Sequence, residues 1–312
     1  GTGSVMSSAA RKLMSASGGG AVTGAIAVAH ISSPYVSAYS WDVDNGFGGK
    51  YSNPSTLPAS HSLGVAFSPD GSAIAVAHVS SPYVSAYPWS GSGFGTKFAN
   101  PATLPAGTGW GVAFSPDGSA IAVSNQSSSP YINAYPWSGS GFGTKFANPA
   151  TLPANHGYSV AFSPDGSAIA VSSQNSPYVL AYPWSGSGFG TKFANPSTLP
   201  PYTGNGVSFS PDGSAIAVAH ASSPSVSAYP WSGSGFGTKF ANPATLPTGN
   251  SYDVAFSPDG SAIAVAHFTT PFVAAYPWSG SGFGTKFANP STLPPSTAYS
   301  VSFSTVGDPQ EV

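Results

Sequence analysis

A five-residue peptide recurs along the chain at a nearly constant interval, and this repeat limits the fold more than any other feature. Phe-Ser-Pro-Asp-Gly begins at five phenylalanines, and a degenerate sixth copy follows, so the markers are Phe67, Phe114, Phe162, Phe209, Phe256 and Phe303. A second marker has the same period, since tryptophan stands at Trp41, Trp89, Trp137, Trp184, Trp231 and Trp278. Both series advance by 47 or 48 residues. A period of this length is typical of stacked repeats that bury a continuous core between neighbours.

Each unit contains four candidate strands. In the second unit these are Gly64–Phe67, Ala73–Ala77, Tyr83–Tyr87 and Thr96–Ala99. The first two are joined by Ser-Pro-Asp-Gly, in which proline presets φ, aspartate bonds nearby backbone and glycine adopts a conformation that other residues avoid. The strands alternate at period two, and no 3.6-residue period is present. The sequence therefore predicts an all-β fold: a six-bladed β-propeller of four-stranded antiparallel blades.

The two ends of the repeat region are complementary. The first unit starts at its second strand, Gly24–Ala29, and the chain ends its last repeat with an isolated first strand, Tyr299–Phe303. We expect the C-terminal strand to complete the N-terminal blade and so close the ring. The expected organisation is a tail or tether over residues 1–23, of which 1–4 resemble an expression remnant, a propeller over 24–304 and a C-terminal tail over 305–312.

Composition excludes several classes of protein. Only 6% of residues are charged, yet 41% are hydrophobic, which is enough apolar surface for a packed core. The net charge is −2 and the cations are scattered, so no footprint for nucleic acid is expected. No apolar stretch is long enough for membrane insertion, and the absence of cysteine excludes disulfides and thiol chemistry. A surface of Ser, Thr, Asn and Gly favours an extracellular or virion-associated protein.

The repeat also resembles a known family. Gly-Val-Ala-Phe-Ser-Pro-Asp-Gly, followed by an alanine-rich strand and a strand ending in tryptophan, resembles WD40 repeats and is similar to the YVTN-type repeats of bacterial propellers. The resemblance spans all six units and implies a propeller that binds partners. The repeat departs from WD40 repeats in two respects. Asp follows Trp only once, at Trp41, and His precedes the first strand only twice, at His61 and His156. The hydrogen-bonded tetrad of WD40 blades is therefore not expected.

The six copies differ mainly in two connections, one before the first strand and one after the second. Antiparallel pairing places both on one side of the disc, here named the variable-loop face, and function usually resides in loops on a rigid scaffold. Equivalent residues before the first strand are Leu63, Trp110, Tyr158, Asn205, Tyr252 and Tyr299. Their aromatic members, supplemented by Tyr202 and Phe268, are candidate ligand-binding residues. The alternative is that these side chains pack between blades.

Histidine is concentrated in the same connections. His61 and His156 precede the first strand, whereas the second connection carries His30, His78, His220 and His267. We expect these imidazoles to contact ligand or cap loops. A metal site is not expected, because packed sheets lie roughly 10 Å apart whereas zinc ligands lie about 2 Å from the metal. No other cofactor is implied.

The carboxylates do not form a catalytic pattern. Five of them belong to Ser-Pro-Asp-Gly turns on the opposite face, and only Asp253 lies on the variable-loop face. We therefore expect no enzyme, but a recognition module for a glycan or a cell-surface or protein partner. The alternative is a structural or scaffold protein, for example a virion component. The lysines recur in the outermost strand, where they protect a sheet edge rather than bind ligand: Lys50, Lys97, Lys145, Lys192, Lys239 and Lys286.

Overall fold

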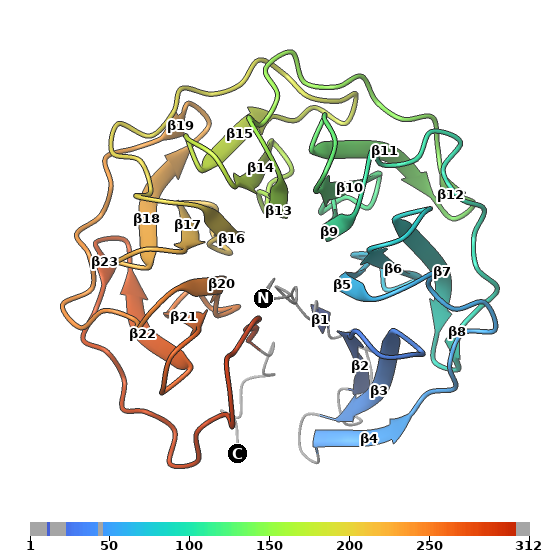
Figure 1. The fold of residues 1–312 in the computed structure, drawn as a ribbon, viewed down its shortest axis with the longest axis horizontal. Helices are drawn as coiled ribbons and strands as arrows, with labels where there is room; N and C mark the ends of the chain where they lie inside the picture. The colour runs from blue at the N-terminus through green and yellow to red at the C-terminus, as the bar shows by residue number, and fades with distance from the viewer. Residues whose placement is uncertain (1–10, 13–22, 43–45, 304–312) are drawn as a thin grey trace, which may run out of the picture.

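The computed structural model describes residues 11–12, 23–42 and 46–303. Six antiparallel sheets are arranged around a central axis, with the first strand of each innermost (Figure 1). The chain is thus an all-β, six-bladed β-propeller, as the repeat predicts. Blades 1 and 2 contain β1 (Arg11–Lys12), β2 (Thr23–Ala29), β3 (Val36–Asp42) and β4 (Gly46–Lys50), then β5 (Ser62–Phe67), β6 (Ala73–His78), β7 (Val84–Ser90) and β8 (Gly93–Phe94).

The other four blades repeat this plan. Blade 3 contains β9 (Gly109–Phe114), β10 (Ala120–Asn125), β11 (Ile132–Ser138) and β12 (Gly141–Phe142), and blade 4 contains β13 (Gly157–Phe162), β14 (Ala168–Ser173) and β15 (Val179–Pro183). Blade 5 contains β16 (Gly204–Phe209), β17 (Ala215–His220), β18 (Val226–Ser232) and β19 (Gly235–Phe236). Blade 6 contains β20 (Ser251–Phe256), β21 (Ala262–His267), β22 (Val273–Ser279) and β23 (Gly282–Phe283).

The core lies between blades, because each blade has one face of small side chains and one of large ones. Alanines pair across strands, as Ala75 does with Ala86. This small face of blade 2 packs on the large face of blade 3, which supplies Ile121, Tyr135 and Trp137. Burial of such side chains drives the stacking, and the alternation in the sequence is what divides them between the two faces.

The fourth strand is shorter than expected. In blade 2 it is β8, two residues long, and Thr96–Ala99 forms no strand. The reason is that the chain leaves the blade edge to reach its neighbour: the Phe98 ring lies 5.3 Å from the ring of Trp137 in blade 3, edge to face. The expected position of the lysines in an outermost strand is confirmed for Lys50, which ends β4. It is wrong for the five that lie outside the strands: Lys97, Lys145, Lys192, Lys239 and Lys286.

The lysines nevertheless have a structural role. The Lys97 ammonium donates to the Asn100 side chain and to the backbone oxygen of Phe98. Equivalent bonds to Asn recur at Lys50, Lys145, Lys192, Lys239 and Lys286. Burial lowers the pKa of Lys97. These lysines hold the connection that crosses to the next blade through hydrogen bonds. Their role here is structural.

A buried tyrosine fastens each crossing connection. The hydroxyl of Tyr182 donates to the backbone oxygen of Thr151, 2.8 Å away, in the connection that enters its own blade. Four more copies repeat this bond at 2.8–2.9 Å, namely Tyr87, Tyr135, Tyr229 and Tyr276. The tyrosine that alternates with alanine in the third strand thus fills the blade interface and also satisfies a loop carbonyl.

The expected ring closure differs from the structure. The inner edge of β2 pairs with β1, through Arg11 opposite Ile26 and Lys12 opposite Ala25. Residues 299–303 form no strand. A partner close in sequence costs less loop-closure entropy than one at the other end of the chain, which favours β1 at this edge. Residues 11–12 therefore belong to the propeller, while the rest of the expected 1–23 tail, apart from Thr23 in β2, and the 305–312 tail lie outside the described residues.

The C-terminal segment still docks on blade 6 in the manner of a first strand (Figure 1). The Thr297 hydroxyl donates to the backbone oxygen of Phe268, 3.2 Å away, as Thr108 and Thr203 do at their own junctions. The Asp253 carboxylate accepts from the Ser300 hydroxyl at 2.8 Å and from the backbone N–H of Val301 at 3.1 Å. Burial raises the pKa of Asp253 to about 6. Asp253 is thus occupied in holding this segment.

Candidate functional site

The strand register fixes which loops share a face. Ser62, at the start of β5, pairs with His78, at the end of β6, whereas Phe67 pairs with Ile74 at the other end. The connection into β5 and the connection out of β6 therefore open on the same side. The same pairing recurs in blades 3 to 6. The variable-loop face predicted from the sequence is a real face of the disc.

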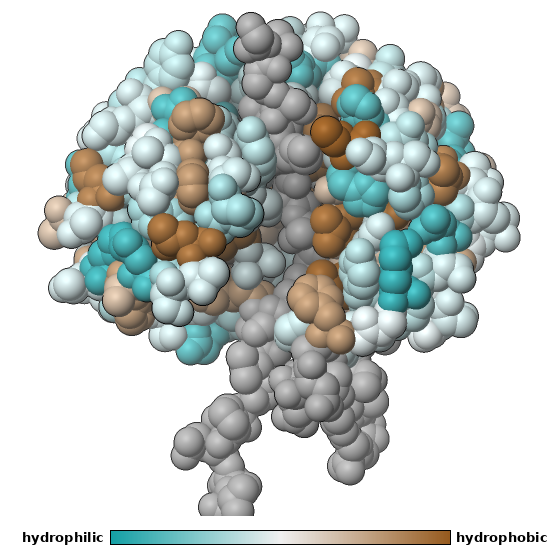
Figure 2. Space-filling view, turned by 60° about the horizontal axis from the view of Figure 1, so that its bottom comes forward, coloured by the Kyte–Doolittle hydropathy of each residue, from teal (hydrophilic) through white to brown (hydrophobic). Residues whose placement is uncertain are grey.

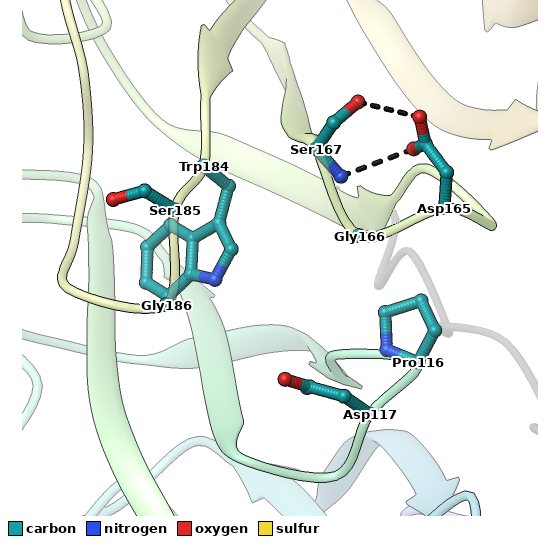
Figure 3. A pocket seen from close by; sticks show the side chains of 8 residues that line it. All are labelled: Pro116, Asp117, Asp165, Gly166, Ser167, Trp184, Ser185 and Gly186. Atoms are coloured by element: carbon teal, nitrogen blue, oxygen red, sulfur yellow. Dashed lines mark hydrogen bonds between the residues drawn. The ribbon is translucent and has the colours of Figure 1, made fainter.

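The opposite face is built from Ser-Pro-Asp-Gly turns. In Figure 3 the carboxylate of Asp165 accepts from the backbone N–H of Ser167 at 3.0 Å and from its hydroxyl at 2.7 Å. The Ser163 hydroxyl donates to the same carboxylate at 2.6 Å. These bonds, that from Ser163 first, hold the pKa of Asp165 below its ordinary value. The hollow of about 530 Å³ that Asp165 shares with Asp117 of the preceding blade is therefore lined by carboxylates that serve their own turns.

The inner rim on the variable-loop face is largely packed. Trp110 is only 8% exposed, its indole N–H donates to the Gln126 side chain at 2.6 Å, and its ring lies 5.1 Å from that of Tyr158. Tyr252 and Tyr299 pair similarly, with ring centroids 4.9 Å apart. The predicted ring of ligand-binding aromatics is thus mainly inter-blade packing. The prediction that Trp110 is an exposed anchor is wrong, because its side chain is buried.

Leu63 and Asn205 occupy the same rim position and are also buried. The Asn205 amide donates to the backbone oxygen of Ser251 in the next blade, 2.7 Å away. Tyr158, Tyr252 and Tyr299 remain partly exposed, so part of each side chain reaches solvent. The rim therefore supports the binding face without forming a continuous aromatic surface.

The histidines of the second connection point inward. His78, His220 and His267 are fully buried. The His78 ring nitrogen Nε2 lies 3.0 Å from the hydroxyl of Ser85 on the next strand, and Nδ1 lies 2.8 Å from the backbone oxygen of Ser80. The partly buried His30 has the same two kinds of partner. The prediction that these imidazoles contact ligand is wrong for the three buried ones, whereas capping of the loop fits His30 and His78.

The copies that lack this histidine differ at both positions of the histidine–serine pair. In blade 3, the amide of Asn133 donates to the side-chain oxygen of Asn125, 2.7 Å away. In blade 4, Ser173 stands where the histidine would be and Leu180 where its serine partner would be. Burial lowers the pKa of His78 and of His220 to about 4, so both are neutral at pH 7. The variation at this position is therefore repacking of the blade rather than variation of a ligand contact.

A pocket of about 580 Å³ opens on the variable-loop face between blades 4 and 5. Apart from Ala154, which precedes β13, its residues come from the connection after β14 and from the connection that enters β16. The rings of Tyr178 and Tyr202 lie 6.3 Å apart with a tilt of 31°, and Tyr202 is 56% exposed. The full lining is Ala154, Gln174, Asn175, Ser176, Tyr178, Tyr202 and Thr203. Of the residues predicted from sequence, only Tyr202 belongs to this pocket.

Tyr178 is the residue that sequence reasoning missed. Its φ is 68°, in the left-handed region that side chains other than glycine seldom adopt. The conformation is held because its N–H donates to the backbone oxygen of Asn175 and its C=O accepts from the N–H of Ser173, both at 2.9 Å. The same position carries Tyr35, Tyr83, Tyr131, Ser225 and Phe272, all with positive φ.

The other predicted residues lie at other junctions of this face. Phe268 is 53% exposed beyond the end of β21. His61 is exposed and His156 is partly buried. Each imidazole faces one of the strained tyrosines, His61 facing Tyr35 and His156 facing Tyr131, with ring centroids 6.2 Å apart in both pairs. These two junctions and that of Tyr178 with Tyr202 are therefore variants of one arrangement, in which a tyrosine of one blade meets a side chain of the next.

Charged residues are few, at 6% of the chain. Figure 2 shows a face that is mostly pale, with scattered hydrophilic and hydrophobic residues. Within the described ranges, no group of three or more histidine, aspartate or glutamate side chains is arranged to hold a metal ion. The described residues also include no helix that is long and apolar enough to span a membrane.

No protein-family model matches the chain, and no curated protein matches it. The resemblance to WD40 and YVTN repeats therefore rests on the repeat motif and on six antiparallel sheets in repeated units. Such a fold is compatible with a binding module or a scaffold, and the fold alone does not decide between them.

Proposed function

We propose that this propeller is a non-catalytic recognition module that binds a glycan or another cell-surface partner through its variable-loop face. One observation carries the proposal: the pocket between blades 4 and 5 unites a strained tyrosine, an exposed tyrosine and two side-chain amides on the face where the copies differ. The opposite face, by contrast, repeats one turn with its carboxylates already bonded. Differences confined to loops on a rigid scaffold are expected of a recognition surface.

A non-catalytic role fits the chemistry of the pocket. Its lining has no carboxylate, imidazole or amine that could act as an acid, base or nucleophile. Asp253, which the sequence analysis places on this face, accepts hydrogen bonds from the Ser300 hydroxyl and from the backbone N–H of Val301. Aromatic rings with amides and hydroxyls provide contact area and hydrogen bonds, which serve binding.

A glycan array and a pull-down from cell-surface extract test the proposal together. The wild-type protein should bind reproducibly in at least one of them. A variant with Tyr202→Ser and Phe268→Gln should bind about tenfold more weakly or not at all, because it removes two exposed aromatics. Both replacements are residues that other copies carry at the same positions, Ser60 and Gln126, so the blades should remain folded.

The matched control is Phe287→Ser, which removes an aromatic of similar exposure, 49%, from the outer connection of blade 6. Binding by this control should equal that of the wild type. If the double variant binds as well as the control, recognition does not occur through the variable-loop face and the proposal fails.

A scaffold role is the second candidate, and one feature favours it. Equivalent leucines of the crossing connections are exposed around the disc, at Leu57, Leu104, Leu246 and Leu293. An assembly that uses these leucines would bury them against another protein. Such an assembly would form equally well with the Tyr202 and Phe268 double variant, which separates the two functions.

A further inference from the structure

The pocket between blades 4 and 5 has a geometry that limits how a ligand ring could lie in it. The rings of Tyr178 and Tyr202 are 6.3 Å apart. A ring inserted between two others needs roughly 7–8 Å, since contacting carbon atoms lie about 3.5–4.0 Å apart. A ligand therefore cannot enter between the two tyrosines. It has to lie over the exposed side of Tyr202, with Tyr178 supporting that ring from below or beside it.

The polar groups around Tyr202 are neutral and accessible. Among the described residues, the side-chain amides of Gln174 and Asn175 have no hydrogen-bond partner, and Asn175 is exposed. The backbone groups beside them are already used: the Gln174 N–H donates to His156, and the Gln174 oxygen accepts from the Thr203 hydroxyl at 3.1 Å. Two primary amides provide donors and acceptors together, which suits a ligand whose hydroxyl groups also do both.

Charge argues against an ionic ligand. The pocket lining contains no basic residue that could compensate a carboxylate or sulfate, and taking an unpaired charge out of water is costly. His156 lies next to the pocket wall, but burial lowers its pKa and so favours the neutral imidazole. A cation would meet no carboxylate in the lining either. The ligand that fits this lining is uncharged.

We propose that this pocket binds one uncharged pyranose ring, whose C–H face lies on Tyr202 and whose hydroxyls bond to the amides of Gln174 and Asn175. The assignment rests on the proposed recognition function and specifies the ligand class of that site. An apolar face with a polar edge is what an exposed tyrosine ring and neighbouring amides accommodate together.

The other junctions explain why a single ring per chain is expected. At the position of Tyr202 the other copies carry Ser60, Gly107, Asn155, Gly249 and Ser296. At the junction of blades 3 and 4 the amide of Gln126, equivalent to Gln174, is occupied by Trp110 of its own blade. Among the junctions that the structure describes, only that of blades 4 and 5 combines an exposed aromatic of one blade with an unoccupied amide of the blade before it, whereas the exposed Phe268 meets Asn250 within its own blade. Binding should therefore saturate at one sugar per chain.

Titration of the full chain with monosaccharides tests the inference. The neutral probes are the methyl glycosides of galactose, glucose, mannose and N-acetylglucosamine, and the acidic probes are glucuronic acid and N-acetylneuraminic acid. We expect saturable binding of at least one neutral probe at one site per chain, by calorimetry or ligand-observed NMR. Tyr202→Ser should weaken that binding about tenfold, whereas Tyr202→Phe, which keeps the ring, should change it less than about twofold.

Two further variants complete the test. Gln174→Ala should weaken binding of the same probe without changing the folded circular-dichroism spectrum, and Phe287→Ser should leave binding unchanged. Binding of acidic probes alone, equal binding by Tyr202→Ser and wild type, or several sites per chain would overturn the inference. If no probe binds while the variable-loop face still captures a protein partner, the sugar assignment fails and the recognition function stands. If neither occurs, both fail.

Discussion

Replacing Trp231 with alanine is expected to lower the free energy of unfolding by about 3–5 kcal/mol, the range for deleting a large buried aromatic side chain. Trp231 is buried, and its ring contacts three phenylalanine rings edge to face, with centroids 5.1–5.2 Å apart: Phe193, Phe209 and Phe236. Phe193 belongs to the connection that leaves blade 4, so the substitution weakens a junction between blades as well as one blade. Equilibrium unfolding in urea, followed by circular dichroism, measures the effect.

Ser232→Ala is the matched control, because Ser232 is the exposed neighbour of Trp231. Its effect should remain within about 0.5 kcal/mol, as for surface substitutions in general. A Trp231→Ala variant as stable as this control would show that the aromatic cluster does not hold the blades together. The repeated tryptophan would then need another explanation.

The second large effect concerns acid. Burial lowers the pKa of His78 and of His220 to about 4, from an ordinary value near 6.5. The folded state therefore binds fewer protons than the unfolded state between those two values, and stability falls as the pH drops from about 6.5 to about 4. Each shift corresponds to about 3 kcal/mol. Asp253 acts in the opposite direction, since its raised pKa of about 6 adds stability as the pH falls toward 4.

A graft from blade 4 isolates the contribution of His78. The double variant His78→Ser and Ser85→Leu introduces the pair that blade 4 carries at Ser173 and Leu180, at the same spacing of seven residues. We expect this variant to lose about 3 kcal/mol less stability than the wild type between pH 7 and pH 4. His220 is unchanged in this variant, so its own contribution to the pH dependence of stability should remain. An unchanged pH dependence would mean that His78 is not buried as a neutral imidazole.

Much of the fold could be predicted from the sequence, because the repeat is dictated by local rules. Alternation of alanine with isoleucine or valine sets two faces for each strand, and Ser-Pro-Asp-Gly sets the turn. The length of the fourth strand could not be predicted, since Phe98 is drawn to Trp137 of the next blade. The partner of β2 could not be predicted either. Both β1 and residues 299–303 are candidates for its inner edge, and the hydrophobic pattern does not indicate which of them pairs.

The candidate site was predicted only in part. Comparison of the copies indicated the face on which the pocket between blades 4 and 5 opens, and it included Tyr202, which is exposed. It did not distinguish variation at a surface from variation in the core: Trp110 and His78 are buried, and each is hydrogen-bonded within its blade, to Gln126 and to Ser85. The role of Tyr178 was hidden, because a positive φ is a property of the folded loop and the residue reads as the start of a strand.

One measurement tests the central claim, recognition through the variable-loop face, more directly than any other. A disc carrying His61→Thr, Asn175→Ser, Tyr202→Ser and Phe268→Gln has at each position a residue that another copy already contains. Its counterpart has four exposed serines of the opposite face changed to alanine: Ser90, Ser138, Ser185 and Ser232. Both are compared with the wild type on the glycan array and in the pull-down. We predict that the first disc loses the wild-type partners and the second keeps them, whereas retention by the first and loss by the second would contradict the account.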